Sequence, residues 1–204
     1  MSGKTKDFKV VLLGPYHVGK TSIIERYCNN VFIAKTKQTV GAGFFTKTLT
    51  IDSSEVTLMI WDTAGDERFK AITPSLLHGA NCMMLVFDLS SSQSFTGVED
   101  YLNLFLNSYS PTNNEMPVIL VGNKMDLPQD QIEVPQESID SWLSDHHVEM
   151  YQAVSALSGQ NIDHAFDQLI KYLLKNEVKT EEHITFEIKP AEPVEKTEEE
   201  KKCC

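Results

Sequence analysis

The sequence feature that most constrains the fold is the loop Gly14–Thr21 (GPYHVGKT), which has the form G-x-x-x-x-G-K-[ST]. It follows the apolar run Phe8–Leu13 (FKVVLL), which predicts a buried strand, and it leads into Gly19–Asn29, whose apolar spacing predicts a helix. Between a strand and a helix, such a loop holds phosphate oxygens with its backbone N–H groups and the helix N-terminus. The chain is therefore predicted to bind a nucleoside triphosphate on an α/β fold.

Two side chains of this loop have specific predicted roles. Lys20 supplies a cation to the β- and γ-phosphates, and the Thr21 hydroxyl is a ligand for Mg²⁺. The other predicted nucleotide contacts in this segment are Gly14, Tyr16, His17, Val18, Gly19 and Ser22. The alternative is a strand–turn–helix junction that matches the pattern by chance, and the motifs further along the chain argue against it.

Short apolar runs alternate with longer amphipathic segments along the rest of the chain. The predicted strands are Phe44–Ile51 and Val56–Trp61, joined by the polar turn Asp52–Glu55, followed by Cys82–Leu89, Pro117–Gly122 and the weaker Glu149–Val154. The predicted helices are Ser94–Tyr109 with Ser94 as its N-cap, Pro135–His147 with Pro135 in its first turn, and Ile162–Lys175. This alternation predicts an α/β sandwich with a mainly parallel sheet.

Composition predicts one domain over residues 1–175 and a tail over residues 176–204. Glu, Lys, Thr and Pro dominate the tail, which cannot bury enough apolar area to offset its ordering entropy, so it is predicted to be disordered. The apolar patch Ile184–Ile188 within it either docks on the domain or a partner, or belongs to a solvated linker. Cys28 and Cys82 lie singly in apolar stretches, which predicts buried reduced thiols.

The charge balance excludes some partners. The formal net charge of −11 argues against nucleic-acid binding and against a purely electrostatic attachment to anionic lipid. Met1–Asp7 lacks the apolar core of a secretory signal, and no apolar run approaches the roughly 20 residues of a membrane-spanning helix. These features favour a reduced, cytosolic chain.

A second motif, Trp61–Gly65 (WDTAG), closes an apolar strand. Asp62 then lies at the carboxyl end of that strand, near the phosphate loop in a parallel sheet, where it can hold Mg²⁺ through a water. Gly65 has no side chain, so its N–H can approach a γ-phosphate closely. An isolated motif of this kind would also suit a capping Asp before an ordinary loop, but its pairing with a phosphate loop favours the metal and phosphate roles.

A third motif, Asn123–Asp126 (NKMD), predicts that the base is guanine. The Asp126 carboxylate can accept hydrogen bonds from guanine N1–H and the exocyclic amine, whereas adenine would leave that charge unpaired. Asn123 can meet the N7 side of the base and tether the loop, while the Lys124 stem packs along the ring. After the last predicted strand, Ser155, Ala156 and Leu157 can offer a backbone N–H to guanine O6.

In these three motifs and their order, the sequence resembles the Ras superfamily of small GTPases, and within it the Rab family, over roughly Phe8 to Lys175. The resemblance implies the P-loop small-GTPase fold, a six-stranded mainly parallel sheet with helices on both faces. It also implies that Phe32 stacks on guanine and that Thr39 binds Mg²⁺ and the γ-phosphate. The segment Val40–Phe44 resembles the Rab switch I signature, and Leu58–Phe69 resembles the Rab segment leading into switch II. In that family these stretches typically form the effector-facing surface.

The terminal Cys203 and Cys204 resemble the double-cysteine end on which Rab proteins are geranylgeranylated. Two lipid chains give stable membrane anchoring where one chain is marginal. The alternative is that these two cysteines have no role. Lipidation would place the chain on the cytoplasmic face of intracellular membranes, cycling with the cytosol.

Three residues depart from the Rab pattern in ways that bear on mechanism. Asp66 stands where the family normally has the glutamine that orients the attacking water, so intrinsic hydrolysis is expected to be slow. Tyr16 occupies a loop position often held by a small residue, beside the space of an incoming arginine finger, unless its ring turns to solvent. Leu157 replaces a lysine, which should weaken binding slightly without loss of specificity. The segment Leu76–Ala80 also lacks the usual switch II aromatics.

The sequence thus predicts a Rab-like switch that binds GTP with Mg²⁺, hydrolyses it to GDP and recruits effector proteins in vesicle trafficking. The predicted catalytic residues are Lys20, Thr39, Gly65 and Asp66. The resemblance further implies an exchange factor, a GTPase-activating protein and the prenylation machinery as partners. The alternative is a nucleotide-loaded recruitment module with negligible hydrolysis of its own. A P-loop kinase is disfavoured because no acceptor-substrate lid or catalytic arginine cluster is evident.

Overall fold

The computed structural model describes residues 5–34, 37–51, 54–65, 73–108 and 117–181. Six strands form one sheet in the order β2-β3-β1-β4-β5-β6. Their bounds are Thr5–Leu13 (β1), Ala42–Ile51 (β2), Ser54–Thr63 (β3), Cys82–Asp88 (β4), Val118–Asn123 (β5) and Met150–Ala153 (β6). Only the β2–β3 pair is antiparallel, so the predicted six-stranded, mainly parallel sheet is confirmed.

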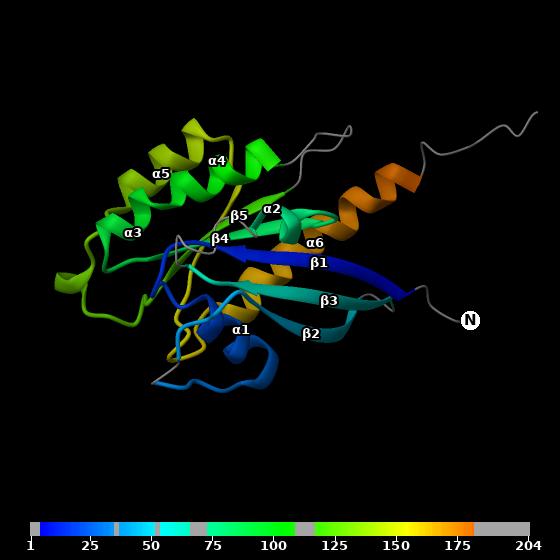
Figure 1. Cartoon of the computed structure of the whole chain (residues 1–204), viewed down its shortest axis with the longest axis horizontal. Coiled ribbons are helices and arrows are strands. Elements are labelled where there is room, and N and C mark those ends of the chain that lie inside the picture. Colours follow the sequence, from blue (N-terminus) through cyan, green and yellow to red (C-terminus); the bar gives the residue numbers. More distant parts are fainter. Residues whose placement is uncertain (1–4, 35–36, 52–53, 66–72, 109–116, 182–204) are drawn as a thin grey trace, which may run out of the picture.

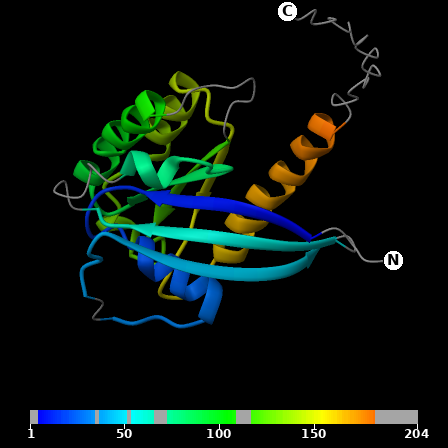
Figure 2. The same cartoon turned by 45° about the vertical axis from the view of Figure 1, so that its right-hand side comes forward.

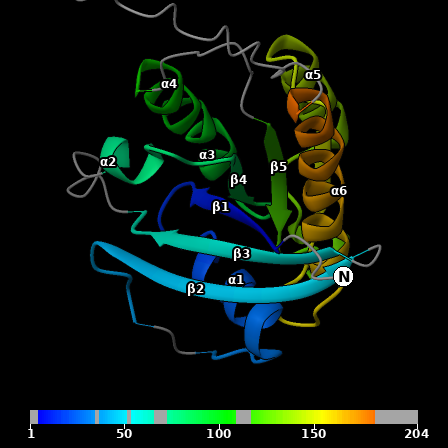
Figure 3. The same cartoon turned by 90° about the vertical axis from the view of Figure 1, so that its right-hand side faces the viewer.

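Helices cover both faces of this sheet, with α1 on one side and α3, α4 and α5 on the other (Figures 1 and 3). The helix bounds are Lys20–Asn29 (α1), Thr73–Leu77 (α2), Ser92–Thr96 (α3), Val98–Ser108 (α4), Gln136–Asp145 (α5) and Ile162–Glu181 (α6). A short 3₁₀ turn, Gln129–Gln131, precedes α5. Among the described residues, no helix combines the length and the apolarity needed to cross a bilayer.

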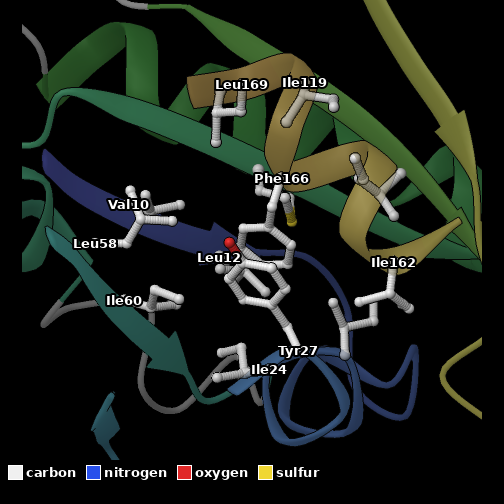
Figure 4. Close-up of a cluster of buried hydrophobic side chains, with 14 of the residues drawn as sticks. Val10, Leu12, Ile24, Tyr27, Leu58, Ile60, Ile119, Ile162, Phe166 and Leu169 are labelled. Atoms are coloured by element: carbon white, nitrogen blue, oxygen red, sulfur yellow. The ribbon is translucent and has the colours of Figure 1, made fainter. Parts of the chain in front are cut away.

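The alternation of side chains along β1 divides the core in two. Val10 and Leu12 face α1 and α6, while Val11 and Leu13 face α2, α4 and α5. A strand that is buried on both faces must be continuously apolar, which explains the run FKVVLL. On the α1–α6 side, the rings of Tyr27 and Phe166 stack with their centroids 3.7 Å apart, and they join the two helices (Figure 4).

The sequence predicted one helix over Ser94–Tyr109, but the structure has two, α3 and α4, which meet at Gly97. The predicted cap was also wrong. Ser91 is the N-cap of α3, and its hydroxyl oxygen accepts a hydrogen bond from the Ser94 N–H at 3.1 Å. The Ser94 hydroxyl is buried and instead accepts a hydrogen bond from the Asp88 N–H at 2.9 Å. Two serines three residues apart offer the same capping chemistry, and packing against β4 decides between them.

Other element ends differ by a few residues from the predicted ones. Pro135 is the N-cap of α5 and lies outside its first turn. α6 continues to Glu181, six residues beyond the predicted end at Lys175. The polar composition after Lys175 does not stop a helix, because Glu and Lys are good helix formers. Helix α2 was not predicted, and Asp52, Ser53 and Tyr109 lie outside the described residues.

α6 runs across the molecule from one end of the sheet to the other. Its first residue, Ile162, follows the loop after β6, at the carboxyl ends of the parallel strands. Its last turns lie at the opposite end, on the side where β1 begins (Figures 1 and 2). α6 therefore ends on the side of the domain where the parallel strands start.

Candidate nucleotide-binding site

A pocket of about 310 Å³ lies at the carboxyl ends of the parallel strands. This edge is where α/β sheets bind ligands, because the loops between strands and helices meet there. Segments far apart in the sequence line it: the phosphate loop, residues 32–34 and 37–39, the end of β3, and the loops after β5 and β6. The predicted site residues in its lining are Tyr16, His17, Gly19, Lys20, Thr21, Ser22, Phe32, Thr39, Gly65, Asn123, Lys124, Asp126, Ala156 and Leu157.

Four predicted site residues lie directly behind this lining. Gly14 packs so closely on β4 that a Cβ there would lie 2.1 Å from the Val86 carbonyl oxygen. Val18 is 1% exposed, and its carbonyl accepts a hydrogen bond from the Asn123 side-chain amide at 2.8 Å. Asp62 and Ser155 are also buried and contact residues of the pocket through their side chains. These four support the site from beneath.

Lys20 is held at the centre of the phosphate loop. Its Nζ donates hydrogen bonds to the carbonyls of Gly14 at 2.7 Å and Pro15 at 2.9 Å. Burial lowers the pKa of the Lys20 ammonium to about 8, and the nearby Asp62 carboxylate opposes that shift. A cation with so little water around it is a strong partner for phosphate oxygens.

The three residues predicted to hold Mg²⁺ lie together. Asp62 Oδ2 accepts hydrogen bonds from the hydroxyls of Thr21 at 2.6 Å and Thr39 at 3.1 Å. The two hydroxyl oxygens lie 2.9 Å apart. Burial raises the pKa of Asp62, and the hydrogen bond from Thr21 acts against that shift.

The other oxygen of the same carboxylate gives a direct test of fit to a cation. Asp62 Oδ1 is buried and has no hydrogen-bond partner among the residues that the structure describes. A buried anionic oxygen without a partner is costly, and a hard cation bound directly or through a water would satisfy it. The described residues contain no group of three or more His, Cys, Asp or Glu side chains placed to hold a metal ion. The donors at this site are two hydroxyl oxygens and one carboxylate, a set that suits Mg²⁺ with phosphate oxygens as its further ligands.

On the base side, one amide ties three loops together. Asn123 Nδ2 donates to the Val18 carbonyl at 2.8 Å, and Asn123 Oδ1 accepts from the Ala156 N–H at 3.1 Å. Asp126 Oδ1 accepts a hydrogen bond from the Ser155 hydroxyl at 2.5 Å. These bonds hold the phosphate loop, the Asn123–Asp126 loop and the Ser155–Leu157 loop in one arrangement, and the predicted tether by Asn123 is present.

Of the residues that depart from the Rab pattern, Tyr16 and Leu157 lie at the pocket and are exposed. Tyr16 is 45% exposed and also lines the pocket, with its ring centroid 3.6 Å from that of His17. Its ring is therefore both open to solvent and at the pocket. Leu157 is 53% exposed at the pocket edge. Asp66, Cys203 and Cys204 lie outside the described residues, as does the segment 67–69.

Several residues that shape the site were not predicted. Arg26 on α1 donates to the carbonyls of Ala156 at 3.0 Å and Leu157 at 2.7 Å. Asp88 at the end of β4 pairs with Lys124 Nζ at 2.5 Å. Ile33, Ala34, Lys37, Gln38, Thr63 and Leu127 complete the pocket lining. Most of these six neighbour a predicted site residue in sequence, whereas Arg26 has no motif that marks it.

Comparison with known proteins agrees with the motifs. Residues 9–175 match the Ras family model. The chain is 38% identical over 178 residues to the Ypt/Rab-type GTPase ypt7 of Schizosaccharomyces pombe, which covers 86% of this chain and 87% of the relative. It is 40% identical over 171 residues to RABG3b of Arabidopsis thaliana, covering 83% and 84%. For Rab7 of Drosophila melanogaster the values are 36% over 183 residues, covering 89% and 87%. The chain belongs to the Ras family and is a Rab-type small GTPase, a GTP-hydrolysing switch of vesicle trafficking.

Proposed function

We propose that this GTPase binds GTP with Mg²⁺ in the pocket between Lys20, Asp62 and Asp126, and that its own hydrolysis is slow. The observation that carries the proposal is the oxygen cluster of Thr21, Thr39 and Asp62. Within the described part of the chain, one buried oxygen of the Asp62 carboxylate has no hydrogen-bond partner, and the carboxylate interacts with the charge of the buried Lys20. A cation and a terminal phosphate would satisfy both groups at once.

Each residue then has a role in the cycle. Lys20 holds the β- and γ-phosphates, and Thr21, Thr39 and Asp62 would hold Mg²⁺. Bound Mg²⁺ would neutralise the charge that develops on the phosphate oxygens. The Gly65 N–H donates to a γ-phosphate oxygen. Loss of the γ-phosphate removes the contacts to Thr39 and Gly65, so the segments that carry them relax and an effector is released.

Slow hydrolysis follows from the residue after Gly65. The Asp66 carboxylate cannot donate a hydrogen bond to the γ-phosphate, and its negative charge repels that group. An amide at this position would do the opposite, because it accepts from the attacking water and donates to the phosphate. The same feature supports the second candidate, a nucleotide-loaded recruitment module whose turnover depends on residues that a partner supplies.

Single-turnover GTP hydrolysis separates a slowly hydrolysing switch from a recruitment module with negligible hydrolysis. It also tests the roles given to Asp66 and Tyr16. We expect Asp66→Gln to raise the rate constant about tenfold or more, since one placed polar group is worth this much in related sites. Tyr16→Gly should raise it less, by opening the space beside the phosphates. Asp130→Gln makes the same acid-to-amide change at an exposed site outside the pocket and should leave the rate unchanged. If neither Asp66→Gln nor Tyr16→Gly accelerates hydrolysis, the account of both residues is wrong.

The proposed cycle also needs partners that act on this site. An exchange factor replaces GDP, a GTPase-activating protein accelerates hydrolysis, and effectors bind the surface formed by residues 40–44 and the start of switch II. Two of the side chains there are apolar and exposed, Val40 at 76% and Phe44 at 52%. We further propose that Cys203 and Cys204 carry geranylgeranyl groups that anchor the chain to intracellular membranes.

A further inference from the structure

Gly65 lies between two peptides that are each fixed by a hydrogen bond. The Ala64 N–H donates to the Gly41 carbonyl at 2.9 Å. The Tyr101 hydroxyl, which comes from α4, donates to the Gly65 carbonyl at 3.0 Å. The peptide that carries the Gly65 N–H lies between these two fixed points, so its direction is restricted from both sides.

The backbone of the phosphate loop limits Gly65 on a third side. A Cβ at this residue would lie 2.5 Å from the Pro15 carbonyl oxygen and 2.6 Å from the Tyr16 nitrogen. Gly65 lines the pocket, and none of the described residues accepts a backbone hydrogen bond from its N–H. The N–H is thus free to meet a ligand oxygen in the pocket, while the residue that carries it has little room to move.

α4 is placed to hold Gly65 because its start packs on the same loop. A Cβ at Gly97, just before α4, would lie 2.9 Å from Pro15 Cγ. Tyr101 follows Gly97 by four residues, about one helical turn, and therefore projects from nearly the same side of the helix. The Tyr101 side chain is 4% exposed and belongs to the core cluster that includes Leu13 and Phe105. Its ring cannot turn away without disturbing that core.

We propose that Tyr101 is a positioning residue of the switch: by holding the Gly65 carbonyl, its hydroxyl aims the Gly65 N–H at the terminal phosphate and so favours GTP over GDP. This inference rests on the proposed function, because it assumes that a γ-phosphate meets Gly65. GDP has no oxygen at that position, so the benefit of the aimed N–H is confined to the triphosphate. α4 thereby takes part in sensing the nucleotide, although none of its residues lines the pocket.

The test is Tyr101→Phe, which removes the hydroxyl and keeps the ring in the core. Dissociation constants are measured with Mg²⁺ for a non-hydrolysable GTP analogue and for GDP. The analogue should bind about 3- to 10-fold more weakly, the effect of one neutral hydrogen bond, while GDP binding changes less than about twofold. Tyr151→Phe makes the same change on β6, away from the pocket lining, and should leave both constants as in the wild type.

The ratio of the two constants decides between positioning and a merely structural role. An equal weakening of both nucleotides, or a variant that no longer folds, would mean that the hydroxyl only supports the core and would overturn the inference. An unchanged ratio would overturn it as well. If the wild-type protein bound neither guanine nucleotide, the proposed function itself would fail, and that result is read from the wild type alone.

Discussion

The Asp126 carboxylate is the side chain on which base selectivity depends in the proposed site. One of its oxygens accepts from the Ser155 hydroxyl at 2.5 Å, which orients the group, and the residue lines the pocket. In Asp126→Asn the amide can donate to a carbonyl at the position where guanine has an amine. We expect GTP to bind roughly 10- to 100-fold more weakly, the effect of one charged hydrogen-bonded pair, and xanthosine triphosphate to bind more tightly.

Competition binding of the two triphosphates measures this change in preference. Asp130→Asn serves as the control, because Asp130 is exposed and lies outside the pocket lining. A preference for GTP that survives in Asp126→Asn would remove Asp126 from the base site.

How much of the site could be predicted depended on how each residue acts. Lys20, Asp62 and Asp126 sit in short motifs whose spacing brings them to one edge of the sheet, so they could be identified from the sequence. Arg26 and Tyr101 instead act on backbone carbonyls of loops 130 and 36 residues away. Any residue offers a carbonyl, so no pattern in the sequence marks such a pair. Only the packing of α1 and α4 on the sheet brings them together.

Among the elements, α1 does more than present the phosphate loop. Its Arg26 donates to the carbonyls of Ala156 and Leu157 through separate nitrogens of one guanidinium, and to the Asn30 carbonyl at 3.1 Å. The Arg26 guanidinium therefore joins α1 to the loop that is expected to contact guanine O6. In the proposed site, the base and the phosphates are held by elements that Arg26 joins, so weaker hydrogen bonds from this side chain should weaken the binding of any guanine nucleotide.

Arg26→Lys keeps the positive charge but replaces the fork with a single point donor. We expect GDP and a GTP analogue to dissociate about 5- to 10-fold faster, with their ratio unchanged, since the contact acts on the base. Stopped-flow release of fluorescent nucleotides measures both rates, and Lys171→Arg on the exposed side of α6 is the control. Release at the wild-type rate would show that the Ser155–Leu157 loop keeps its conformation without the hydrogen bonds from Arg26. If Arg26→Lys changed the ratio of the GTP-analogue and GDP release rates, Arg26 would act on the γ-phosphate as Tyr101 is proposed to do, and its assignment to the base would be wrong.

The elements also show where periodicity misleads. Apolar spacing continues from Phe95 through Val98 to Phe105, so a single helix was predicted. Gly97 adopts ordinary right-handed helical angles, and Pro15 packs closely on it at the point where α3 ends and α4 begins. Apolar spacing does not reveal where such a helix ends, because it continues across the end of α3. The buried strands β1, β4 and β5 were predicted to within a few residues, because continuous apolar runs follow from burial on both faces.

For the molecule as a whole, the net charge of −11 bears directly on membrane attachment. A surface of this sign is repelled by anionic lipid, so binding must come from burial of hydrocarbon. We expect the double substitution Cys203→Ser with Cys204→Ser to move most of the protein from the membrane fraction to the cytosol, as measured by fractionation of cells. Cys28→Ser, at a half-buried thiol on α1, should not change the distribution. A double variant that stayed with membranes would exclude the proposed anchor.

The direction of α6 sets the geometry of such an anchor. The helix ends at Glu181, on the side where β1 begins (Figures 1 and 2). The nucleotide pocket lies at the other ends of the parallel strands. Residues 182–204 span at most about 80 Å when fully extended, whereas a domain of this size has a radius of gyration of about 16 Å. With the proposed lipids on Cys203 and Cys204, a segment of this length would let the pocket face away from the bilayer at a variable height. Exchange of nucleotide and capture of a partner on a facing vesicle would then require no detachment from the lipid.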